Sequence, residues 1–413
     1  MKFSVVLLLL LPPLAAPPLV AAPAPPLSLT DALARVEAGH PFLRTRDAES
    51  RLAAARTAQA TARPPVEVSL QFENALGTGE LSAARSLETT LQLSRALEQA
   101  DRRAARATAA AARNDAEHLA WAERRRELHA EAACRFIRVV AAQAELAAAR
   151  DATDLARRSA DAVAAHVSAH VALPAEIARS RLALAEAALE SEHAEHLLLS
   201  ARHSLASLWG ATTPDFALAL ADLTTLPAPA AYDTLVARLT ATPAQARFTA
   251  LARWREAQER LARRESTRGD VRWSAGLRRV EATDNFVVGL GYALPHRAAG
   301  DASAAEARAE RDRTVADGEA ALHAVRATLF SLYQELGHAR IAHDTARDEL
   351  IPAATAWLAA IDAGLAAGRY HVRDQLEART ALLSARRRQI TAAADYHATL
   401  VELEHLLAAP ASS

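Results

Sequence analysis

Several residue types that usually carry enzymatic or metal chemistry are scarce in this 413-residue chain. Its one cysteine, Cys134, excludes an intrachain disulfide and a cysteine-based metal cluster. Aromatic residues are only 4% and the net charge is -1, which argues against a nucleic-acid partner. The sequence also has no glycine-rich phosphate loop and no serine-nucleophile turn. We therefore expect no catalytic residue, no cofactor and no enzymatic activity.

Long apolar runs are scarce as well. Lys2 precedes a short apolar run over residues 3–11, and small residues and prolines follow, which is typical of a signal peptide over 1–24. Beyond it no run of 18 apolar residues occurs, so a helix is not expected to cross a membrane. If the mature protein lies in a membrane, a closed β-barrel is the remaining way to satisfy its backbone groups.

Helix-forming residues dominate what is present. No glycine or proline interrupts residues 98–173, and a helix of about 65 residues would be about 100 Å long. A second long stretch contains Pro352 as a kink. Apolar residues there step by 3, 4, 3 and 4, which predicts a coiled-coil seam, and they are Leu322, Val325, Leu329, Leu332 and Leu336.

The two halves of the chain show the same sequence organisation, which indicates an internal repeat. Leu33 corresponds to Leu235 and Pro41 to Pro243, both at an offset of 202. The expected organisation is a signal peptide over 1–24, repeat 1 over 25–209, a linker over 210–231, repeat 2 over 232–408 and a tail over 409–413. Repeat 1 contains a helix, a β-hairpin over 65–95, a long helix over 98–166 and a return helix over 175–208. Repeat 2 contains a helix, a β-hairpin over 270–295, a long helix over 301–366 and a return helix over 372–408.

Each predicted hairpin alternates apolar and polar residues, which indicates strands with one apolar face. The strands have the length of tilted membrane-crossing strands. The residues expected to face lipid are Val66, Val68, Leu70, Phe72, Leu91, Leu93, Trp273, Leu277, Phe286, Val288, Leu290 and Tyr292. The alternative is a pair of small soluble hairpins that cover a helical core.

Four membrane strands per chain cannot close a barrel, because the smallest barrels need about eight strands. An open sheet in lipid would leave backbone groups unpaired at a cost of about several kcal/mol each. Long, narrow helical hairpins also need lateral neighbours to bury a core. The sequence therefore predicts an oligomer if the hairpins cross a membrane.

Four local motifs and the repeat organisation resemble one known family. The motifs are Leu29-Thr30-Asp31-Ala32-Leu33 with His40-Pro41-Phe42-Leu43, then Gly300-Asp301 with Ala305-Glu306-Ala307-Arg308, then Leu350-Ile351-Pro352-Ala353-Ala354, then Ala367-Gly368 with Asp374 and Glu377-Ala378. Together they resemble the TolC-like outer-membrane factor family, and especially its heavy-metal (cobalt-zinc-cadmium) efflux branch.

The resemblance implies a mainly α fold with a small β part, built from two structural repeats. Three chains would form a long coiled-coil α-barrel in the periplasm and a 12-strand transmembrane β-barrel in outer-membrane lipid. The homotrimer would meet a periplasmic adaptor (membrane fusion) protein and an inner-membrane pump of the resistance-nodulation-division type. It would serve a Gram-negative bacterium as a passive conduit that exports metal cations or small toxic compounds.

The resemblance also implies a function for the helical turns. Asp374 and Glu377 would form an acidic gate at the periplasmic entrance, and their i, i+3 spacing places them on one helix face. Such carboxylate rings favour cations. The alternative is that both are ordinary solvated helix residues. Adaptor contact is expected in the turn regions, at Gly364, Gly368, Pro174 and Glu176.

Two further interpretations bear on function. The pairs His166/His170 and His193/His196 have spacings that suit a metal, but neither has an evident third ligand, so solvated helix faces are preferred and no metal site is assigned. The alternative function is a soluble periplasmic coiled-coil adaptor or scaffold. Adaptors normally carry additional β-domains with many short strands, whereas this sequence shows four clear strands in two similar repeats, which favours the channel.

Overall fold

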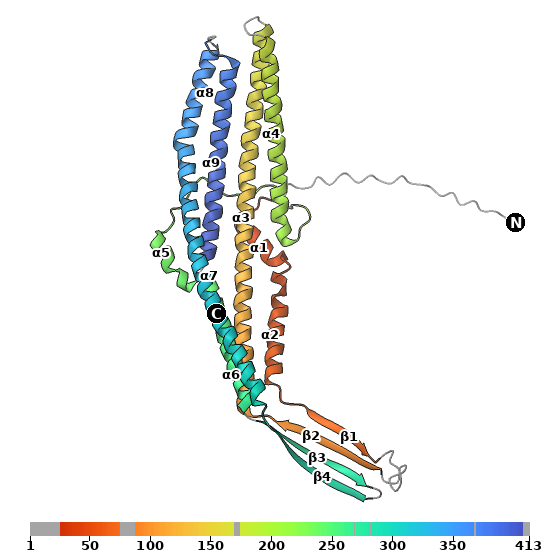
Figure 1. Ribbon diagram of the computed structural model, residues 1–413. Helices are drawn as coiled ribbons and strands as arrows, with labels where there is room; N and C mark the ends of the chain where they lie inside the picture. The colour runs from red at the N-terminus through yellow and green to blue at the C-terminus, as the bar shows by residue number, and fades with distance from the viewer. Residues whose placement is uncertain are drawn as a thin grey trace, which may run out of the picture.

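The computed structural model describes residues 25–74, 87–168, 174–267, 269–280, 283–366 and 369–407. The helices run along one long axis, with a sheet at one end and the helical turns at the other (Figure 1). The predicted signal peptide over 1–24 and tail over 409–413 lie outside the described residues. Among the helices of the described chain, none combines the length and the apolar character needed to cross a membrane.

Repeat 1 runs from a short helix through a hairpin into two long helices. Its elements are α1 (Leu29–Gly39), η1 (Leu43–Thr45), α2 (Arg46–Thr61), β1 (Val66–Glu73), β2 (Glu88–Leu97), α3 (Ala100–Ser168), α4 (Pro174–Ala206) and η4 (Ser207–Trp209).

Local sequence explains where these helices start and how long they run. A capping box starts α1, because Ser28 Oγ accepts from the Asp31 N–H at 3.1 Å and Asp31 Oδ2 accepts from the Ser28 N–H at 3.4 Å. Helix α3 has 69 residues, or about 100 Å, because neither glycine nor proline interrupts its alanine-rich sequence. Pro174 is the first residue of α4, a position where its missing N–H costs little.

Repeat 2 has the same order with one interruption. Its elements are α5 (Tyr232–Ala237), η5 (Leu239–Ala241), α6 (Pro243–Thr267), β3 (Asp270–Val280), β4 (Thr283–Ala293), α7 (Arg297–Thr345), the π-helical turn η6 (Ala346–Leu350), α8 (Ile351–Ala366) and α9 (Val372–Leu407).

The second long helix is therefore divided where the sequence predicts a kink. Pro352 is the second residue of α8, just after η6, and it cannot donate to the carbonyl group four residues earlier. A π-turn accommodates this lost bond by widening the helix locally. Helix α7 also begins at Arg297, earlier than expected, and the His296 Nδ1 accepts from the Ala299 N–H at 3.2 Å as its cap.

The four strands form one antiparallel sheet in the order β1-β2-β3-β4. Strands β2 and β3 pair across the two repeats, with Leu91 opposite Leu277 and Leu93 opposite Ala275. Strands β3 and β4 stay paired up to Val280, which lies opposite Thr283. Strands β1 and β4 are the two edges of the sheet in the described chain.

Each repeat has an apolar cluster along its long helices. In repeat 1, Phe136 of α3 and Leu205 of α4 are buried together with residues of α1. In repeat 2, Leu329 and Leu336 of α7 pack with Tyr396 of α9. The buried leucines of α7 belong to the predicted coiled-coil seam, so the 3-and-4 spacing does mark the face that meets a neighbouring helix.

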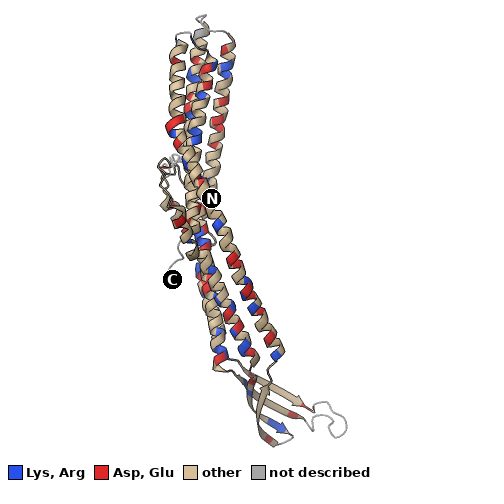
Figure 2. Cartoon of the chain, turned by 60° about the vertical axis from the view of Figure 1, so that its left-hand side comes forward, with Lys and Arg blue, Asp and Glu red and all other residues tan. Residues whose placement is uncertain are grey.

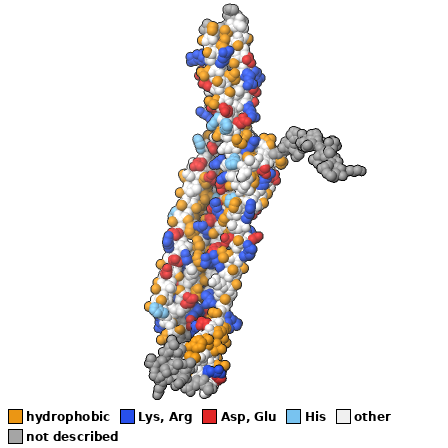
Figure 3. Space-filling model, turned by 90° about the vertical axis from the view of Figure 1, so that its right-hand side faces the viewer, with side chains coloured by type: hydrophobic (Ala, Val, Ile, Leu, Met, Phe, Trp, Pro, Cys, Tyr) orange, Lys and Arg blue, Asp and Glu red, His pale blue; other side chains and the backbone are white. Residues whose placement is uncertain are grey.

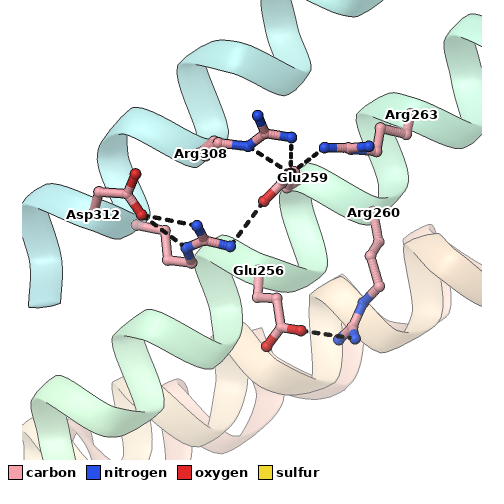
Figure 4. Close-up of polar contacts among 7 residues, drawn as sticks. Glu256, Glu259, Arg260, Arg263, Arg308 and Asp312 are labelled. Atoms are coloured by element: carbon pink, nitrogen blue, oxygen red, sulfur yellow. Dashed lines mark hydrogen bonds and ion pairs between the residues drawn. The ribbon is translucent and has the colours of Figure 1, made fainter.

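A buried carboxylate ties α6 to α7 near the sheet (Figure 4). Glu259 of α6, whose side chain is only 9% exposed, accepts from Arg263 of the same helix at 2.7 Å. It also accepts from Arg308 and Arg311 of α7 at 3.1 and 3.2 Å. Charge-assisted bonds of this kind fix the relative position of the two helices from which β3 and β4 extend.

The observed architecture is the predicted fold class. The chain is mostly helical, carries one four-stranded antiparallel sheet, and places two similar repeats side by side. Charged residues of both signs occur along the whole length of the helices and also on the strands (Figure 2).

Candidate functional site

The sheet has one apolar face, and strand register brings the predicted lipid-facing residues together on it. Val68 of β1 lies opposite Leu93 of β2, and Leu277 of β3 lies opposite Phe286 of β4. Exposure is high at Phe286 (70%) and Leu290 (78%). All residues of the predicted set are exposed except Trp273, which is half-buried. Hydrophobic side chains accordingly gather at the sheet end of the molecule (Figure 3).

The opposite face of the sheet is polar and small. Arg278 of β3 pairs with Glu73 of β1 at 3.4 Å and also with Glu88 of β2. Arg272 pairs with Glu67 across the sheet. Gly276 lies on this face, where a Cβ would come within 2.3 Å of the Leu91 carbonyl oxygen. A polar face with small residues suits the concave, water-facing side of a curved sheet.

The helical turns form the second candidate region, at the far end of the molecule (Figure 1). Asp374 lies in the first turn of α9, where its Oδ2 accepts from the His371 N–H at 2.9 Å. The Asp374 residue is half-buried, and this hydrogen bond caps the N-terminal end of α9. Glu377 is exposed one turn later. The structure thus places the two predicted gate residues close together and gives them different surroundings.

The structure contains a buried polar network beside these carboxylates that the sequence did not predict. Gln375 of α9 is 7% exposed, accepts from Ser159 of α3 at 2.9 Å and donates to Asp362 of α8 at 2.5 Å. Arg379 donates to the Leu155 carbonyl oxygen of α3 at 3.1 Å, and burial lowers the pKa of its guanidinium. These contacts connect the second helical hairpin to the first beside the predicted gate.

One signal could have revealed this network. The buried residues at the start of α9 are spaced by three and four, at Val372, Gln375, Ala378 and Leu382. Gln375 is the polar member of that series. A polar residue in a helix seam needs a partner, so its position predicts a specific contact.

The predicted adaptor-contact residues differ in accessibility. Pro174 is exposed at the start of α4. Glu176 is half-buried and pairs with Arg179 at 3.4 Å, which leaves no net charge there. Gly364 is buried under the Tyr370 ring, and a Cβ would lie 2.2 Å from Tyr370 Cδ2. Gly368 lies outside the described residues. Adaptor contact at these positions stays a prediction.

The described residues also include no group of three or more His, Cys, Asp or Glu side chains arranged to hold a metal ion. His193 and His196 lie on the surface of α4. The side chain of His166 and the whole of His170 lie outside the described part of the chain.

Comparison with known proteins identifies relatives of this architecture. No protein-family model matches the chain. In sequence it is 28% identical over 304 residues to the cobalt-zinc-cadmium resistance protein CzcC of Cupriavidus metallidurans, a match that covers 73% of this chain and 72% of CzcC.

Solved structures share the fold over nearly the whole length. The outer membrane protein VceC of Vibrio cholerae superposes with a TM-score of 0.77 at 14% identity, covering 93% of this chain and 97% of VceC. The outer-membrane channel OprN superposes with a TM-score of 0.77 at 17% identity, covering 92% of this chain and 90% of OprN. The shared fold is the one predicted for the channel, and it differs from the many-stranded β-domains expected of an adaptor. The chain is thus similar in sequence to CzcC and shares the fold of outer-membrane channel proteins such as OprN.

Proposed function

We propose that three copies of this chain form a passive export duct whose sheets together close a barrel in the outer membrane. The observation that carries this proposal is the continuous apolar face of the sheet, made by the register of strands from both repeats. Exposed apolar side chains on one face and ion pairs on the other suit a wall between lipid and an aqueous channel.

The sheet edges support assembly into a closed ring. In the described chain β1 and β4 each have one neighbouring strand. An edge that stays unpaired in lipid is strongly unfavourable. Pairing of β1 in one subunit with β4 in the next would satisfy both edges, and three chains would contribute twelve strands, four from each.

The helices offer a matching pair of surfaces. Helix α4 exposes the apolar side chains of Leu182 and Leu189, which are spaced by one heptad. On the other side of the molecule, a groove of about 1120 Å³ runs between α7 and α9 and is lined in part by Ala339, Ala342 and Leu383. Helices α4 and α8 lie on opposite sides of the subunit (Figure 1). We propose that α4 of one subunit packs in the α7–α9 groove of the next.

The turn end of this trimer would be the periplasmic entrance. Glu377, exposed on α9, would recur around the axis and favour cations there. A periplasmic adaptor would contact the turns and connect the duct to an inner-membrane pump of the resistance-nodulation-division type. We propose metal cations as cargo, because CzcC is named for cobalt, zinc and cadmium resistance.

Assembly and conductance test the proposal. The full chain is expressed with its own N-terminus, the cell envelope is fractionated, and the detergent-extracted protein is measured by size-exclusion chromatography with light scattering. We expect a trimer in the outer-membrane fraction that forms ion-conducting pores in planar bilayers. A monomer or dimer in the soluble periplasmic fraction would contradict the proposal.

Cargo is tested separately in the native host. Deletion of the gene is expected to lower the tolerated concentrations of cobalt, zinc and cadmium salts, and re-expression is expected to restore them. Unchanged metal tolerance combined with increased sensitivity to organic toxins would retain the channel and reject metal cations as its cargo.

A further inference from the structure

The apolar face of the sheet carries charged side chains only near its two ends, in the described strands. At the end far from the helices, Arg279 of β3 forms two hydrogen bonds with Asp284 of β4, at 2.7 and 2.9 Å. Their opposite charges offset each other. At the end near the helices, the charged side chain on this face is Arg95 of β2.

Arg95 has a different environment from Arg279. Its cross-strand neighbours are Val66 of β1 and Trp273 of β3. Its Nε donates to the Pro64 carbonyl oxygen at 3.1 Å, which is its one polar side-chain contact among the described residues. This bond orients a planar guanidinium that still has N–H donors to offer. The side chain is half-buried, so part of it remains accessible.

Aromatic residues with polar tips flank this end of the face. Trp273 lies directly opposite Arg95, and Tyr292 lies opposite Val271 on the neighbouring strand pair. The Tyr292 hydroxyl oxygen accepts from the Gly269 N–H at 3.2 Å. Tryptophan and tyrosine with apolar bodies and polar tips are typical of the depth at which lipid headgroups lie.

We propose that Arg95 binds the phosphate group of a phospholipid in the periplasmic leaflet of the outer membrane. This inference rests on the proposed membrane placement of the sheet. The guanidinium has no carboxylate partner in the described part of the chain, lies on the side proposed to face lipid and is flanked by interfacial aromatics, so it matches a phosphate in charge and in its fork of donors. The site would hold one phospholipid at each subunit and fix the depth of the sheet in the membrane.

Lipid retention by the purified trimer tests the site. Native mass spectrometry would count dioleoylphosphatidylglycerol molecules bound to the wild-type trimer, to Arg95→Gln and to the matched control Arg279→Gln. We expect Arg95→Gln to lose up to one bound lipid per subunit, and the lipid concentration for half-occupancy to rise by about tenfold. The control is expected to behave as wild type, because Asp284 already neutralises Arg279.

Two further probes identify the group that is bound. Dioleoylglycerol, which has the same chains and no phosphate, is expected to bind all three proteins equally. Inorganic phosphate at the same concentration is expected to leave phospholipid retention unchanged, whereas displacement by it would indicate a free-anion site. If Arg95→Gln does not form trimers, Arg95→Lys keeps the charge without the planar fork and is expected to bind with intermediate strength.

Quenching of Trp273 separates failure of this inference from failure of the membrane proposal. Phospholipids brominated near the headgroup are expected to quench the fluorescence that Trp273→Phe removes. Equal phospholipid retention by wild type, Arg95→Gln and Arg279→Gln, with Trp273 still quenched, would overturn the Arg95 site alone. If no brominated lipid quenches Trp273, the placement of the sheet in the membrane is wrong, and the Arg95 site with it.

Discussion

At the scale of single residues, the two carboxylates of the proposed gate, Asp374 and Glu377, have different surroundings. Asp374 accepts a backbone hydrogen bond at the start of α9, so its loss would also disturb the helix end. Glu377 is exposed on the same helix. Substitution by the matching amides removes each charge and keeps the side-chain size, and Asn at 374 can still accept through its amide oxygen.

The first prediction concerns the selectivity of the entrance. In planar bilayers, Glu377→Gln is expected to lower the permeability ratio of potassium to chloride, because three carboxylates leave the axis of the trimer. Asp374→Asn is expected to lower it less, because its carboxylate is half-buried against the backbone. Arg373→Gln serves as a control from the same helix turn. Unchanged ion selectivity in both amide variants would identify these carboxylates as ordinary solvated residues.

The sequence predicts the two carboxylates of the proposed gate but not the buried polar contacts beside them. The spacing of Asp374 and Glu377 is visible in the sequence, and so is the periodic series that contains Gln375. The partner of Gln375 cannot be identified from the sequence, because Ser159 is 216 positions away and becomes adjacent only when the two hairpins pack. Long-range polar contacts of this kind depend on tertiary packing, which local patterns do not encode.

At the scale of elements, the strands are the part that sequence describes best. Period-two alternation identifies the apolar residues, because side chains on a strand alternate between faces. Alternation leaves two things open, which are the order of the strands and their register. The pairing of β2 with β3 joins residues about 180 positions apart, and it places Trp273 beside Arg95. No local signal in either strand specifies that contact.

The second prediction tests which face of β4 meets lipid. Val288→Arg places a charge at the middle of the exposed apolar face, whereas Val287→Arg places the same charge on the opposite face of the same strand. A lipid-facing arginine near the bilayer midplane costs about 2–4 kcal/mol. We therefore expect less Val288→Arg trimer in the outer membrane and a lower denaturant midpoint for its unfolding. Val287→Arg is expected to assemble normally, and the reverse order would mean that the faces are assigned the wrong way round.

At the scale of the whole molecule, the two sides of the subunit differ. The leucines of α4 are on one side and the α7–α9 groove is on the other, so the proposed contact between copies would run head to tail. Head-to-tail contacts close into a ring only when every member offers both surfaces. A subunit with Leu182→Asp and Leu189→Asp would keep its groove and lose its apolar α4 surface.

Such a subunit would act as a dominant inhibitor when it is produced beside the wild type. It still accepts a neighbour through its groove, enters assemblies and stops them from closing. With equal amounts of both chains, about one-eighth of randomly assembled trimers would contain wild-type subunits alone. At a fixed total amount of chain, bulk conductance and metal tolerance are expected to fall toward one-eighth of the value for wild type alone. A variant that cannot join any assembly would leave about half of that value, because half of the chains are still wild type. Because every subunit must offer both its α4 surface and its groove, one defective variant is expected to inactivate most of the channels in the cell.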